Sequence, residues 1–190
     1  MRLILVKELV PEGGGFGMSE YGLEQATELS RDKIEPPPQR AYHIVNTTSA
    51  LDELLNRLSA AKSFAFDLET TSLNAMSAQL VGISLSPAPG EAYYIPVGHV
   101  GLEQVKQLPL EQVIDRLKSP LEDTNLAKLA HNGKYDMTVL SEYGITVNNL
   151  AFDTMLAAYL LGESSLGLKA LAFNKLGIEM TPITALIGSG

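Results

Sequence analysis

The chain has 190 residues, 45% of them hydrophobic, and a formal net charge of −8. This length suits one substantial core, no apolar run approaches the roughly 18 residues of a membrane span, and the N-terminus lacks a signal-peptide pattern. The acidic balance excludes a protein that coats nucleic acid through a broad basic surface, although a small metal-assisted site for a nucleic-acid end remains open. The absence of cysteine excludes a thiolate zinc site and is compatible with a cytoplasmic protein.

Residues 1–40 differ from the rest of the chain and predict an arm or linker. VPEGGGFG at 10–17 and EPPPQR at 35–40 bracket a polar stretch with weak helical patterning. Glycine frees the backbone, and consecutive prolines hold an extended spacer. GGGFG is not a phosphate-binding loop, because no Gly-Lys-Ser/Thr follows it. We therefore expect the globular domain to cover residues 41–190.

From Ala41 the hydrophobic pattern predicts alternating strands and helices. A helix over TTSALDELLNRLSAA (47–61) is expected to be capped by Thr48 or Ser49. Strands are predicted at 41–46, 64–69, 79–87, 91–97, 126–131 and 148–152, and further helices at 110–121, 134–144, 153–162 and 168–177. The resulting order predicts an α/β fold in which a mixed sheet is flanked by helices.

The predicted strand FAFDLE (64–69) ends in two carboxylates on one face. Side chains alternate along a strand, so Phe66 and Leu68 point one way while Asp67 and Glu69 point the other. Asp67 as a turn cap and Glu69 as a solvated strand end would be a purely structural explanation. The alternative is a site for Mg²⁺ or Mn²⁺, because hard cations take oxygen ligands and remove the repulsion between the carboxylates.

A third carboxylate that could join this pair lies in HNGKYD (131–136). Asn132 and Asp136 are four residues apart and share one face of the predicted helix. The structural alternative is that Asn132 caps this helix and that Asp136 favours its positive end. Asp153, which directly precedes an apolar helix, is expected to be an N-cap and not a metal ligand. The three histidines do not have the spacing of a metal site.

FDLETTSL, HNGKYD and FDTMLAAYLL resemble the first two exonuclease motifs and the following helix of the 3′–5′ proofreading domain in bacterial family-A DNA polymerases. The resemblance runs from about Ala41 to the C-terminus. It implies a ribonuclease H-like sheet, two Mg²⁺ or Mn²⁺ ions as cofactors, and a single-stranded DNA 3′ end as substrate. Residues 1–12 also resemble the tail of a preceding 5′-nuclease domain, so a polymerase domain and a 5′-nuclease domain are the implied partners.

The resemblance implies a role for each matching residue. Asp67, Glu69 and Asp136 match the catalytic metal ligands, with Asp67 shared between two ions and Glu69 also orienting the attacking water. The residues that match DNA-contacting positions are Thr70, Leu73, Asn132 and Tyr135. Tyr135 as ordinary core packing is at least as good an interpretation.

The family carries a third motif, Tyr-x3-Asp, beyond the segment that resembles TPITALIGSG (181–190). The chain stops before it, so we expect a domain that is incomplete at its C-terminus and an exonuclease that is weak or inactive by itself. Two alternatives remain open. One is a catalytically silent structural module of the polymerase, and the other is a stand-alone ribonuclease D-like RNA exonuclease.

Overall fold

The computed structural model describes residues 41–101 and 106–180. The linker expected at 1–40 and the segment TPITALIGSG lie outside the described residues. None of the helices in the described ranges is long and apolar enough to cross a membrane.

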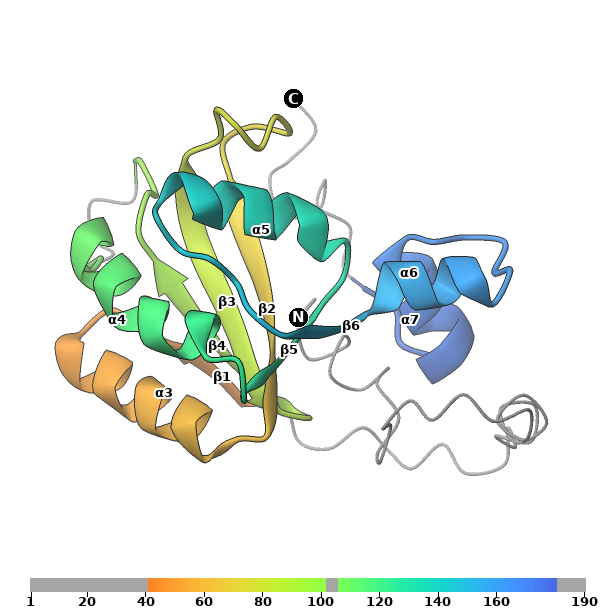
Figure 1. Cartoon of the computed structure of the whole chain (residues 1–190), viewed down its shortest axis with the longest axis horizontal. Helices are drawn as coiled ribbons and strands as arrows, with labels where there is room; N and C mark the ends of the chain where they lie inside the picture. The colour runs from red at the N-terminus through yellow and green to blue at the C-terminus, as the bar shows by residue number, and fades with distance from the viewer. Residues whose placement is uncertain (1–40, 102–105, 181–190) are drawn as a thin grey trace.

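The described residues form a six-stranded mixed sheet with helices packed on it (Figure 1). Its strands are β1 (Ala41–Ile44), β2 (Ser63–Thr70), β3 (Leu80–Ala88), β4 (Glu91–Pro96), β5 (Ala127–Ala130) and β6 (Leu150–Asp153), in the order β1-β4-β3-β2-β5-β6. Strand β3 is antiparallel to β2 and β4, whereas β1–β4, β2–β5 and β5–β6 are parallel pairs. The predicted mixed α/β sheet is confirmed, and β2 lies inside it between β3 and β5.

The helices follow the predicted pattern with small shifts at their ends. They are α3 (Thr48–Ala60), α4 (Leu110–Glu122), α5 (Gly133–Glu142), α6 (Thr154–Leu160) and α7 (Leu168–Leu176). The predicted cap of the first helix is wrong by one residue. Thr47 has extended dihedral angles and its side chain accepts a hydrogen bond from the Ala50 N–H at 3.2 Å, so Thr48 is already helical.

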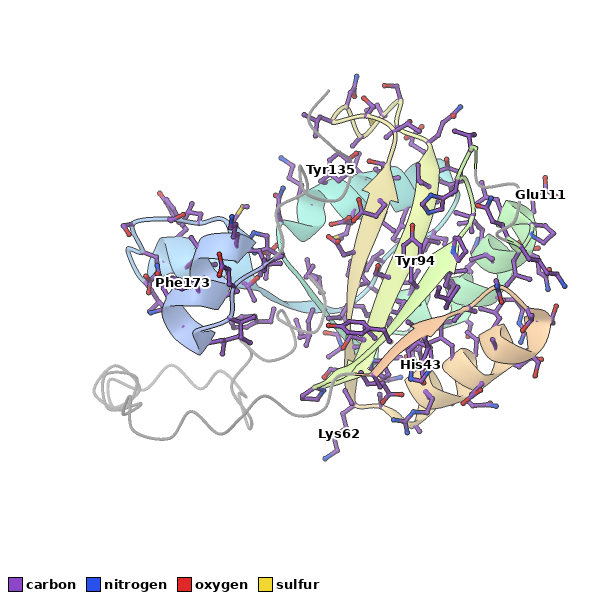
Figure 2. The ribbon with its side chains drawn as sticks, turned by 180° about the vertical axis from the view of Figure 1, so that it is seen from behind. His43, Lys62, Tyr94, Glu111, Tyr135 and Phe173 are labelled. Atoms are coloured by element: carbon purple, nitrogen blue, oxygen red, sulfur yellow. The ribbon has the colours of Figure 1, made fainter. Side chains whose placement is uncertain are left out.

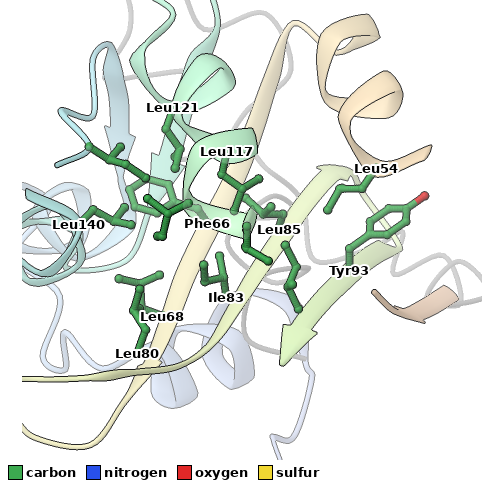
Figure 3. Packing of buried hydrophobic residues seen from close by; sticks show 14 of the residues in the cluster. Leu54, Phe66, Leu68, Leu80, Ile83, Leu85, Tyr93, Leu117, Leu121 and Leu140 are labelled. Carbon is green, nitrogen blue, oxygen red and sulfur yellow. The ribbon is translucent and has the colours of Figure 1, made fainter. Parts of the chain in front are cut away.

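The main core lies on one face of the sheet, beneath α3, α4 and α5. Phe66 and Leu68 of β2 point into it, together with Leu54 of α3, Leu117 of α4 and Leu140 of α5 (Figure 3). Burial of this face explains why the even-numbered positions from Phe64 to Leu68 are apolar. A smaller cluster on the other face joins Ala65 of β2 to α7. Asp67 and Glu69 alternate with the buried residues and therefore lie on the face opposite α3–α5.

An ion pair joins α3 to the first residue of β4. The Arg57 guanidinium donates to Glu91 from Nε at 3.2 Å and from an Nη at 2.5 Å, and the Tyr93 hydroxyl also donates to Glu91 at 2.6 Å. The hydrogen bond from Arg57 is the main cause of a lowered Glu91 pKa. A carboxylate with a lowered pKa contributes stability above its unfolded value, and that contribution is lost as the pH falls through the folded value.

We expect Arg57→Gln to reduce the free energy of unfolding at neutral pH, with a deficit that shrinks below the ordinary glutamate value of 4.5. Urea unfolding of wild type and variant across a pH series measures this difference. Lys118→Gln is the matched control, because it removes a positive charge from α4 without touching Glu91. A constant deficit for Arg57→Gln at every pH would contradict the assignment.

Candidate active site

The two carboxylates of β2 stand at the end of an interior strand. Asp67 is opposite Ser84 of β3, and Glu69 is opposite Gly82. Asp67 is half-buried and Glu69 is exposed, in contrast to the buried Leu68 between them. This arrangement is the one that the alternating pattern predicts.

Asp136 of α5 reaches the same strand segment. Its Oδ1 accepts a hydrogen bond from the Leu68 N–H at 3.1 Å, and its side chain is only 4% exposed. The parallel pairing between β2 and β5 ends at Ala65 and Leu129. The Asp136 carboxylate therefore accepts from an N–H group that β5 does not pair with. Because Leu68 lies between Asp67 and Glu69 in the strand, the hydrogen bond brings the Asp136 carboxylate to the backbone of the segment that carries the other two.

With the side chains oriented as they are, residues 41–101 and 106–180 contain no ready-formed group of three His, Cys, Asp or Glu side chains for a metal ion. The convergence of Asp67, Glu69 and Asp136 on common ions therefore stays a prediction. The donor set fits it chemically, since all three groups offer the oxygen ligands that Mg²⁺ and Mn²⁺ prefer.

Two of the predicted DNA-contacting residues are joined to each other. The Tyr135 hydroxyl lies 2.6 Å from Thr70 Oγ1, and the Ser72 carbonyl lies within hydrogen-bond distance of both hydroxyls, at 3.1 Å from Thr70 Oγ1. The Tyr135 ring packs partly against the main core, as the structural interpretation expects. Leu73, one residue further along the loop, is 98% exposed. The hydroxyl network thus fixes the start of the loop that carries Leu73.

Asn132 does not cap α5 with its side chain, so this part of the structural alternative is wrong. It occupies the N-cap position in the left-handed conformation with φ 62° and makes no capping hydrogen bond. Asp153 replaces it. Its carboxylate accepts from the Asn132 and Gly133 N–H groups at 3.1 and 2.8 Å, and also from Met155 and Leu156 at the start of α6. The predicted N-cap role of Asp153 is confirmed, and it serves two helices.

The sequence patterns do not single out Tyr94, which interacts electrostatically with Glu69, or its partner His99. The Tyr94 hydroxyl is 2.6 Å from His99 Nε2, and Tyr94 lies on the face of the sheet opposite α3–α5 (Figure 2). Burial and, to a smaller extent, the negative charge of Glu69 raise the pKa of Tyr94 to about 12. The sequence signal for this arrangement is an isolated glycine, Gly82, inside strand β3. A glycine in a strand often marks a place where another group comes close to the backbone.

A mixed sheet with carboxylates at the end of an interior strand and on the following helix defines a ribonuclease H-like nuclease fold. The chain belongs to the 3′–5′ exonuclease family, whose model matches residues 42–184. DNA polymerase I of Chloroflexus aurantiacus is 44% identical over 86% of this chain and 17% of its own length. DNA polymerase I of Pseudomonas aeruginosa is 33% identical over 88% of this chain and 19% of its own length. The chain thus spans less than a fifth of these relatives.

Solved structures share the fold. Escherichia coli RNase D, described as an exoribonuclease, superposes with a TM-score of 0.58 at 22% identity, over 78% of this chain and 36% of that chain. Brucella melitensis NrnC with bound Mg²⁺ gives a TM-score of 0.52 at 22% identity, over 74% of this chain and 62% of that chain. Exonuclease domains of this type are metal-dependent.

We expect Asp153→Ala to lower the free energy of unfolding by about 1–4 kcal/mol, because two helix starts each lose a cap worth about 0.5–2 kcal/mol. Denaturant unfolding measures the loss. Thr47→Ala removes a cap from α3 alone and is the matched control, with about half the expected effect. Equal effects for the two variants would mean that Asp153 does not stabilise both helices.

Proposed function

We propose that the chain belongs to the proofreading domain of a cytoplasmic DNA polymerase I. Within that longer protein the domain removes the 3′-terminal nucleotide of single-stranded DNA with two Mg²⁺ or Mn²⁺ ions, whereas the chain by itself is weak or inactive. The observation that carries this proposal is the hydrogen bond from the Leu68 N–H to Asp136, which joins the helix of the second motif to the strand of the first. Membership of the 3′–5′ exonuclease family and the similarity to curated DNA polymerases I support it.

Asp67, Glu69 and Asp136 are the residues that would hold the ions. Bound there, two ions supply a reactive hydroxide and stabilise the charge on the leaving 3′ oxygen. Asp136 is already fixed by the Leu68 N–H, so little reorganisation of this side chain is needed. Glu69 is exposed, which suits a carboxylate that orients the attacking water and accepts its hydrogen bond.

The DNA end would lie along the loop after β2. Leu73 is exposed there and offers an apolar side chain to the terminal base, while Thr70 sits at the base of the same loop. Tyr135 and Asn132, at the start of α5, would contact the adjacent single strand. The polymerase domain and a 5′-nuclease domain are the proposed partners in the longer protein.

A ribonuclease D-like RNA exonuclease is the second candidate. The superposition on Escherichia coli RNase D speaks for the shared fold, since its identity of 22% is too low to carry the substrate. Identities of 44% and 33% to DNA polymerases favour DNA. The structural-module alternative is opposed by the presence of all three carboxylates.

In the longer polymerase that contains this domain, we expect Asp67→Asn to abolish the heat of Mn²⁺ binding at this site and to reduce nucleotide release by about 10³-fold or more, because the groups act as a unit. Calorimetry measures the first effect, and digestion of 3′-labelled single-stranded DNA and RNA of one sequence measures the second. Asp115→Asn is the matched control, since Asp115 is exposed on α4 beyond the main core.

Equal Mn²⁺ binding by Asp67→Asn and Asp115→Asn would overturn the metal assignment. Faster release from RNA than from DNA, lost in Asp67→Asn, would favour the ribonuclease D-like function. Mn²⁺ binding without release from either strand would support the structural-module interpretation.

A further inference from the structure

Glycine at position 82 leaves a space on the sheet that Tyr94 fills. A Cβ atom built on Gly82 would lie 1.9 Å from the Tyr94 hydroxyl oxygen and 2.3 Å from its Cζ. The phenol of β4 therefore leans across β3 and places its hydroxyl where a side chain of residue 82 would begin. Any larger residue at this position would displace the ring.

The residue directly opposite Gly82 on β2 is Glu69. Facing residues of an antiparallel pair have Cβ atoms about 4.5–5.5 Å apart and project from the same face. A hydroxyl at the Cβ place of Gly82 is therefore within reach of the Glu69 side chain. Tyr94 itself is in register with Ser84 and not with Gly82, so its ring crosses diagonally toward Glu69.

The hydroxyl is held from its other side by His99. The His99 Nε2 atom lies 2.6 Å from the Tyr94 oxygen, and the two rings meet edge to face at 66°. Gln107 fixes the His99 backbone, because its Oε1 accepts from the His99 N–H and its Nε2 donates to the His99 carbonyl, both at 2.9 Å. A hydroxyl has one proton and two lone pairs, so a donating Nε2–H leaves the phenol proton available for a carboxylate.

We propose that Tyr94 is a positioning residue of the exonuclease site: oriented by His99, its hydroxyl donates a hydrogen bond to Glu69 and fixes that carboxylate for metal binding and cleavage. The expected effect on cleavage rests on the proposed function. The expected hydrogen bond between Tyr94 and Glu69 does not. The negative charge of Glu69 acts on the Tyr94 hydroxyl. Partners that orient a ligating carboxylate change metal affinity by about 10–100-fold.

The test compares Tyr94→Phe with Tyr93→Phe. Both remove one hydroxyl from β4, but Tyr93 is on the core face and donates to Glu91. The phenylalanine at 94 keeps a ring over Gly82, so the fold is retained. In the longer polymerase, we expect Tyr94→Phe to weaken Mn²⁺ binding about tenfold by calorimetry and to lower kcat for nucleotide release about tenfold, with KM unchanged. Tyr93→Phe is expected to leave all three values within about twofold of wild type.

Gly82→Ala is a second, independent variant. Its methyl group displaces the Tyr94 ring, so it is expected to reproduce the tenfold losses in the wild-type background. In a Tyr94→Ala background the same substitution meets no ring, and we expect it to add less than twofold. An additive effect in that background would overturn the proposed path from Gly82 through Tyr94 to Glu69.

The outcomes separate this inference from the proposed function. If Asp67→Asn abolishes metal binding and release while Tyr94→Phe equals Tyr93→Phe, the role of Tyr94 is overturned and the exonuclease function stands. If the longer wild-type polymerase releases no nucleotide, the exonuclease function fails, and the Mn²⁺ affinities of Tyr94→Phe and Tyr93→Phe still support or overturn the Tyr94–Glu69 contact. Loss in both tyrosine variants would indicate a general effect on β4 and would overturn the specific role.

Discussion

The site depends on the hydrogen bond from the Leu68 N–H to the Asp136 carboxylate. An N–H buried at the end of a strand needs an acceptor, and β5 no longer supplies one beyond Leu129. A carboxylate from α5 satisfies it and is thereby held in a buried position, where its charge would be costly without such a donor. The same bond fixes α5 to β2, where Asp67 and Glu69 carry negative charge on either side of Leu68 in the chain. Cations are the natural complement of that charge, and the metal dependence of the family agrees with this expectation.

Two further sets of hydrogen bonds hold the elements that carry this interaction. Asp153 binds the N–H groups at the starts of α5 and α6, and so fixes the beginning of the helix that presents Asp136. Tyr135, one residue before Asp136, contacts Thr70 at the same end of β2 and the Ser72 carbonyl in the loop that follows. Hydrogen bonds thus hold α5 and the loop after β2 at the end of the strand. Glu69 and Leu73 remain exposed there.

Much of this fold could be predicted from local patterns, because alternation in FAFDLE and helical spacing in the later segments each depend on one face of one element. The identity of a helix cap could not be predicted as well. Thr47, Thr48 and Ser49 are equally good caps in isolation, and only the backbone angle of Thr47 decides among them. Asn132 looked like a cap by sequence, but the carboxylate of Asp153, twenty-one residues later, takes that position in space. Partners this far apart in the chain leave no local pattern.

Tyr94 illustrates the same limit on the other face of the sheet. Residues of β3 that face the site are small: Gly82, Ser84 and Ser86. A large side chain on β3 would stand between β4 and the carboxylates of β2, so small residues there leave the approach open to a ring from β4. The sequence contains the glycine, but the direction in which the ring leans follows from the register of three strands together with the hydrogen bond to His99. Strand β3 contributes no functional side chain to the proposed site, but its small residues determine that the Tyr94 hydroxyl of β4 can reach Glu69.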